Sequence, residues 1–144
     1  MTQITKNIFN SGAYTNKVSM ALLLLRVVIG VFMLTHGLGK LEKLFGSEPI
    51  QFPDLFGMGG TATLALAVFS EVLCSILLIL GLATRVAAIP LLITMLVAAF
   101  IIHAEDGFSK QELPLLYAVI YLFISIIGAG KYSLDYLIFK NKRT

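Results

Sequence analysis

The chain has 144 residues, a length typical of one domain, and 58% of them are hydrophobic while only 13% are charged. This composition, with a mean hydropathy of +0.90, excludes an ordinary soluble domain. The net charge of +3 is not concentrated in a basic patch with interleaved aromatic side chains, so nucleic-acid binding is not expected either. The apolar residues come in long blocks, which predicts a single integral membrane domain over residues 1–144.

Four of these blocks are long enough to cross a bilayer, which takes about 20 predominantly apolar residues. The sequence therefore predicts an all-α, four-transmembrane-helix bundle with spans at about residues 18–41, 62–82, 85–103 and 113–130. The first block lacks the cleavage site of a secretory signal, so we expect it to be retained as a helix. Thr84, which follows the turn at Gly81, is the expected N-cap of the third span.

The longest connection, residues 42–60, is broken by Pro49 and Pro53 but is rich in apolar side chains. We expect it to lie at the membrane interface as a cap over the bundle. Two interpretations of this cap stay open. It is either an interfacial anchor made by aromatic side chains or a functional lid.

The distribution of lysines and arginines predicts the orientation. With both termini in the cytoplasm, that side of the membrane carries Lys6, Lys17, Arg85, Lys131, Lys140, Lys142 and Arg143, and the other side carries Lys40, Lys43 and Lys110. The positive-inside rule therefore favours an N-in, C-in, multi-pass protein.

Two charged residues lie inside the apolar blocks, Glu71 near the centre of the second span and Arg26 in the first. An isolated ionised carboxylate at that depth costs several kcal/mol, so it has to be protonated, paired or turned toward water inside the bundle. At 100° per residue, Arg26 shares a helix stripe with small residues and with Lys40, and Glu71 shares one with Ser75. Both stripes are therefore expected to face the bundle.

A rise of 1.5 Å per residue places Arg26 roughly 12 Å and Glu71 roughly 16 Å above the inner membrane boundary. The sequence thus predicts a buried Arg26–Glu71 ion pair supported by Ser75 and by the hydroxyl of Tyr121. Such a pair is either a functional site or a device that fixes helix register.

A second candidate site gathers at the outer ends of the spans. His36 and Lys40 end the first span, His103 and Glu105 end the third, and Glu112 begins the fourth. Histidines beside carboxylates can bind a divalent metal or relay protons to a quinone head group. Their spacing matches no metal motif, so no metal is predicted. The alternative is that they are interfacial polar residues in water.

Several motifs together resemble those of the DoxX family of small four-helix bacterial membrane proteins. They are the R-x-x-x-G of residues 26–30, the HGxxKL of residues 36–41, the acid Glu71, the GLATRVAA of residues 81–88, His103 and the stretch from Glu112 to Asp135. The resemblance covers roughly residues 22–137. It implies a four-helix integral membrane fold, and the family takes its name from a subunit of a thiosulfate:quinone oxidoreductase.

This resemblance implies a membrane subunit of a quinone-linked redox or oxidative-stress system in the bacterial inner (plasma) membrane. The chain has one cysteine, Cys74, and therefore no cysteine redox pair, so a soluble redox partner is expected. Two alternatives stay open. One is a non-catalytic anchor or assembly protein for soluble partners, and the other is a small proton-coupled transporter, which the lack of an internal repeat disfavours.

Overall fold

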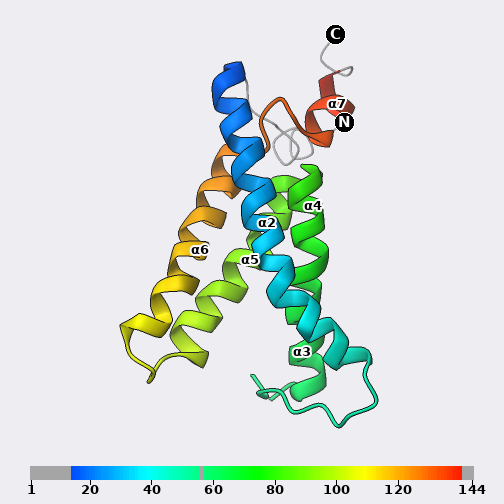
Figure 1. The fold of residues 1–144 in the computed structure, drawn as a ribbon, viewed down its shortest axis with the longest axis vertical. Helices are drawn as coiled ribbons and strands as arrows, with labels where there is room; N and C mark the ends of the chain where they lie inside the picture. Colours follow the sequence, from blue (N-terminus) through cyan, green and yellow to red (C-terminus); the bar gives the residue numbers. More distant parts are fainter. Residues whose placement is uncertain (1–13, 56, 141–144) are drawn as a thin grey trace.

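The computed structural model describes residues 14–55 and 57–140, and every regular element in them is helical (Figure 1). The first long helix is α2 (Asn16–Phe45). The second is made of α3 (Gly60–Val68), the π-helical segment η1 (Phe69–Cys74) and α4 (Ser75–Leu80). The third joins α5 (Thr84–Val97) to a second π-helical segment, η2 (Ala98–Ile102). The fourth is α6 (Phe108–Ile127), and the short α7 (Leu134–Lys140) follows it.

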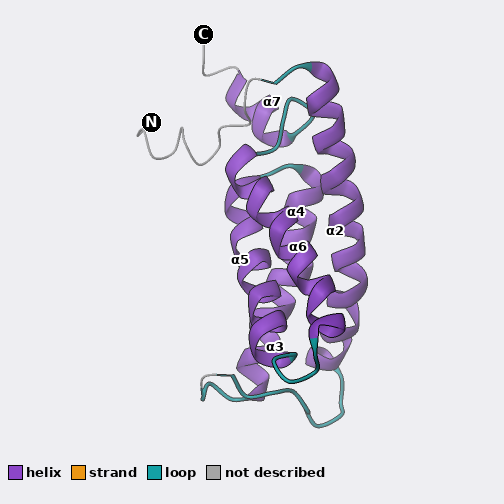
Figure 2. Cartoon of the chain, turned by 90° about the vertical axis from the view of Figure 1, so that its left-hand side faces the viewer, coloured by secondary structure: helices purple, strands orange, loops and turns teal. Residues whose placement is uncertain are grey.

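These four long helices confirm the predicted all-α bundle, and Figure 2 shows them side by side. Each is long and apolar enough to cross a membrane. The largest difference from the expected spans is in the fourth, which begins at Phe108 rather than at residue 113. Pro114 therefore lies in the interior of α6 instead of in its first turn. In the interior, a proline removes one backbone hydrogen bond of the helix. The N-in, C-in orientation stays a prediction.

The bundle has two ends that differ in how they are closed (Figure 1). The α7 end contains the start of α2, the turn at residues 81–83, the segment 128–133 and α7. The loop end contains the last turn of α2, the connection 46–59 and the turn at residues 103–107. We use these two names below.

Small residues let α2 approach the second long helix closely. A Cβ added at Gly30 would come within 2.5 Å of the Ile79 side chain, and one at Gly37 would come within 2.8 Å of Val72. Tight contact through small residues is the usual way in which helices associate in a membrane, where lipid is as apolar as the side chains. Arg26, Gly30, Met33 and Gly37 are all buried, so the predicted inward stripe of the first span is confirmed.

The α7 end is held by a carboxylate that caps a helix belonging to another part of the chain. Asp135 accepts hydrogen bonds from the backbone N–H groups of Ala83 (2.8 Å) and Thr84 (3.0 Å) at the start of α5. The expectation that Thr84 caps this helix is therefore wrong. Gly81 ends α4 in the left-handed conformation (φ 70°), and Ala83 is also left-handed (φ 48°). The turn between the helices is therefore so short that Ala83 is the N-cap of α5 and Thr84 is already its first residue.

Candidate functional site

The buried acid in the second long helix pairs with a lysine rather than with the expected arginine. Lys40 Nζ lies 2.5 Å from Glu71 Oε1. The Glu71 side chain is 1% exposed. The Lys40 side chain is 31% exposed, because Lys40 lies near the loop end of α2. The predicted Arg26–Glu71 ion pair is therefore wrong, although both residues are fully buried as expected.

Arg26 instead turns toward the α7 end of the bundle. Its Nη2 donates a hydrogen bond to the backbone carbonyl of Tyr132 (2.6 Å), and its guanidinium interacts electrostatically with the buried carboxylate of Asp135. The physical reason is that helical side chains lean toward the N-terminus of their own helix. Arg26 therefore points away from Glu71, and Lys40, which lies later on the same helix, points toward it.

Local backbone geometry positions Glu71 at the centre of the bundle. It lies in the π-helical segment η1, and π turns within α-helices are frequent at functional sites. Gly37 of α2 lies directly against it, since an added Cβ there would come within 3.0 Å of Glu71 Cβ. Within the described residues, Glu71 Oε2 has no hydrogen-bond partner. One carboxylate oxygen is thus paired, and the second is buried and oriented toward no donor in that part of the chain.

Aromatic residues of α6 extend from this carboxylate toward His36. The rings of His36 and Tyr117 meet edge to face at 6.5 Å, and those of Tyr117 and Tyr121 lie 6.1 Å apart. The buried hydroxyl of Tyr121 interacts electrostatically with Glu71. In the part of the chain that the structure describes, neither this hydroxyl nor that of Ser75 has a hydrogen-bond partner. The polar groups predicted around Glu71 are therefore buried near it, but they do not bond to it.

A cavity of about 540 Å³ opens beside the Lys40–Glu71 pair, and we call it the polar cavity. Its polar lining includes His36, Lys40, Glu71, His103 and Tyr117, and its apolar lining includes Met33 and Met95. The structure thus brings three of the predicted outer residues together with Glu71 of the predicted inner site. One residue of the predicted inner site, Glu71, and three of the predicted outer site therefore line a single cavity.

Two other predicted outer residues do not join it. Glu105 and Glu112 are exposed and lie outside the lining of the polar cavity. His103 bonds through Nδ1 to Asp106 (2.7 Å), its neighbour in the turn at the loop end. In residues 14–55 and 57–140 there is no group of three or more His, Cys, Asp or Glu side chains that could hold a metal ion.

A second cavity, of about 200 Å³, lies on the other side of the same ion pair, and we call it the apolar cavity. It is bounded by α3, α5 and the connection that precedes α3. Its lining is predominantly apolar, apart from Lys40, Glu71 and two threonines, Thr63 and Thr94. Thr94 donates a hydrogen bond to Ser70 (2.9 Å), so its hydroxyl is satisfied.

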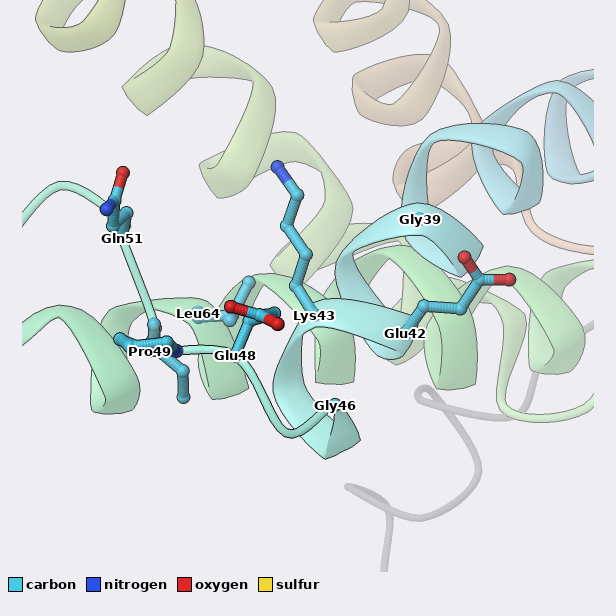
Figure 3. A pocket seen from close by; sticks show the side chains of 9 residues that line it. Gly39, Glu42, Lys43, Gly46, Glu48, Pro49, Gln51 and Leu64 are labelled. Atoms are coloured by element: carbon cyan, nitrogen blue, oxygen red, sulfur yellow. The ribbon is translucent and has the colours of Figure 1, made fainter.

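A third hollow, of about 690 Å³, lies at the loop end beside the last turn of α2 (Figure 3). Its charged residues are Glu42, Lys43 and Glu48, all of them exposed. Figure 3 shows the side chains of Glu42 and Lys43 extending in different directions, so they do not converge on one point. This hollow lacks the buried charge that distinguishes the other two.

Helical periodicity does not indicate which residues lie against the two buried charges. Its place at the end of the first span assigns Lys40 to the outer site, although Lys40 shares the inward stripe of Arg26. Asp135 was not considered as a partner for any buried residue, although its carboxylate is almost fully buried. The direction of helical side chains is the signal that links Lys40 to Glu71 and Arg26 to the α7 end.

Comparison with known proteins finds relatives that match most of this chain. An uncharacterised protein of Haemophilus influenzae is 37% identical over 81% of this chain and 89% of its own length. A second protein of that organism is 35% identical over 83% of this chain and 84% of its own length. A Bacillus subtilis protein named "Putative oxidoreductase CatD" is 28% identical over 84% of this chain and 89% of its own length.

No solved structure matches the chain. The sequence model of the DoxX family matches residues 21–104, which include α2 from Ala21 onward, the whole second helix with Glu71, and the whole third helix. The chain is therefore a member of the DoxX family.

Proposed function

We propose that this protein is a membrane subunit of a quinone-linked redox system of the bacterial inner membrane, and that a quinone head group binds in the polar cavity. One observation carries the proposal. The Lys40–Glu71 pair places a cation, and a carboxylate oxygen that the pair does not use, at a cavity whose other walls include aromatic and apolar side chains. Such a combination of an apolar site and a few convergent polar groups is typical of cofactor pockets.

The residues present fit a quinone. Its two carbonyl oxygens are hydrogen-bond acceptors, for which Lys40 and His36 offer donors, and the hydroxyls of the quinol are donors, for which Glu71 offers an acceptor. When bound, a quinone supplies a carrier of two electrons and two protons. The chain's own contribution is to orient the head group through Lys40 and to hold a proton-accepting carboxylate at Glu71.

We place the electron donor on a soluble partner protein. The one cysteine of the chain is Cys74, which is buried and cannot form a redox pair alone. The relative named as an oxidoreductase supports a redox role for the family fold, although its name says nothing of the donor.

Quinone binding to the purified protein in lipid nanodiscs tests the proposal. We expect a water-soluble quinone to bind, and we expect Glu71→Gln and His36→Ala each to weaken binding. Glu42→Gln, at an exposed position of the same helix end, is the matched control and should bind as the wild type does. If the wild type binds no quinone but retains a soluble partner during purification, the anchor alternative replaces the redox role.

A further inference from the structure

We propose that the apolar cavity holds the apolar chain of the same ligand whose head group lies in the polar cavity, and that this chain enters from the bilayer between α3 and α5. The inference rests on the proposed function, since it assigns the second half of a ligand whose first half is the quinone ring. The class of ligand is therefore a quinone with an isoprenoid side chain.

The two cavities share part of their lining. Lys40, Glu71 and Ala98 line both of them, so the ion pair stands at their junction. On one side of this junction lie His36, His103 and Tyr117, and on the other side lie side chains that are mostly apolar. A molecule with a polar head and an apolar chain matches this change in polarity, with its head group at the ion pair.

The apolar cavity also reaches the lipid-facing surface. Leu66 of α3 and Ile93 of α5 both line it, and each is 55% exposed. Because these helices cross the membrane, side chains exposed on them contact acyl chains rather than water. The lining also includes Ala67, a small residue next to Leu66 on α3, and we place the passage of the chain from the bilayer toward Glu71 beside it.

The connection before α3 closes the loop end of this cavity, and we call its residues 52–55 and 57–59 the strap. Asp54 accepts a hydrogen bond from the backbone of Gly59 (2.8 Å), and Thr63 accepts one from the backbone of Leu55 (3.2 Å). Phe52 is held beside the ion pair, with Lys40 Nζ 6.0 Å from the centre of its ring. The strap therefore covers the apolar cavity from the aqueous side, which leaves the lipid side between α3 and α5 as the route for an apolar chain.

The best readout for this proposal is the position of the chain rather than its affinity. An isoprenoid chain gains little free energy on leaving lipid for an apolar groove, because both surroundings are equally apolar. A chain in the bulk bilayer contacts all lipid-facing helices, whereas a chain in the apolar cavity contacts α3 and α5 selectively.

The experiment uses a quinone with a photoreactive diazirine in its isoprenoid chain, added to the full-length protein in nanodiscs. After illumination, mass spectrometry should find the label on α3 and α5 near Leu66 and Ile93, and excess unlabelled quinone should displace it. Ala67→Phe and Val97→Phe, which fill the cavity from opposite walls, should each lower this labelling about tenfold. Ala65→Phe, at an exposed α3 position outside the lining, should leave the labelling unchanged.

Two outcomes would overturn the proposal. One is labelling that spreads over the lipid-facing residues of all four helices and resists displacement by quinone. The other is displacement by a phospholipid instead of a quinone, which would assign the cavity to lipid. Binding of a chainless, water-soluble quinone separates this inference from the proposed function. If that binding persists while the diazirine label misses α3 and α5, the chain site fails and the head-group site stands. If it is absent, the proposed function itself fails.

Discussion

Removing the two charges of the Lys40–Glu71 pair one at a time should destabilise the protein by unequal amounts. In Lys40→Met the carboxylate of Glu71 remains, only 1% exposed and without its cation. Removing one partner of a buried ion pair costs about 3–5 kcal/mol of unfolding free energy, because the remaining charge stays desolvated. We expect Lys40→Met to approach that loss.

Glu71→Leu should be much milder. The Lys40 side chain is 31% exposed, and its flexible stem can turn the ammonium to the water at the loop end while its methylenes stay against apolar surface. The loss should then resemble that of an exposed pair, about 1 kcal/mol or less. The double variant Lys40→Met/Glu71→Leu should recover most of the stability lost in Lys40→Met, because it leaves no buried charge.

Reversible unfolding in mixed micelles with increasing fractions of denaturing detergent measures these differences. Lys43→Met, at an exposed position one turn beyond Lys40, is the control and should change stability by no more than about 0.5 kcal/mol. The reasoning is refuted if Glu71→Leu costs as much as Lys40→Met, or if the double variant is as unstable as the sum of the two single variants.

Three further predictions concern the packing, the α7 end and the orientation. Gly37→Ala should destabilise the protein by about 1–3 kcal/mol in the same unfolding assay, since the added Cβ has no room. Gly39→Ala is the control and should be neutral or stabilising, because its Cβ would meet nothing within 4 Å. Equal effects of the two substitutions would contradict the close contact at Gly37. Asp135→Ala removes the two hydrogen bonds that cap α5 and a negative charge near the buried guanidinium of Arg26, so we expect a loss of about 2 kcal/mol and faster proteolysis at the turn 81–83, and unchanged proteolysis would count against the cap. In a chain whose native cysteine has been replaced, a membrane-impermeant thiol reagent applied to whole cells should label Glu48→Cys and not Lys131→Cys, and the reverse pattern would show that the predicted orientation is inverted.

The number and placement of the long helices could be predicted from the sequence because the bilayer requires a minimum apolar length. The first span was expected at residues 18–41 and is found at Asn16–Phe45. The error at its end has a physical reason. The residues from Glu42 to Phe45 are polar enough to read as a connection, but they continue the helix beyond the hydrocarbon region, where hydropathy no longer reports on structure.

The burial of Arg26 and Glu71 was also predictable, whereas their partners were not predicted correctly. Counted along the helix axes from the backbone alone, Arg26 and Glu71 lie at similar depths. Both long side chains of α2 lean toward its N-terminus by several ångströms, which brings Lys40 to Glu71 and takes Arg26 toward Asp135. Side-chain direction, rather than helical periodicity, decides which charges meet.

The shared site could not have been read from periodicity alone. The apolar cavity depends on the strap, whose course over α3 is fixed by the hydrogen bonds of Asp54 and Thr63. The polar cavity depends on two π-helical segments, η1 and η2, that an assumption of 3.6 residues per turn excludes. Both features result from tertiary packing.

The π turn that carries Glu71 has a consequence for how relatives of this chain should be compared. A π turn accommodates one residue more than the α turn it replaces. A relative lacking one residue within Phe69–Cys74 would keep its hydropathy and its ability to cross the bilayer, and it would close this stretch as an ordinary α turn, so the residues on both sides of the gap would keep their faces. Ser75 and Leu78 would then stay in the interior, and only residues within the turn, Glu71 among them, would change position, so a single alignment gap can separate homologues that retain the site from those that retain only the fold.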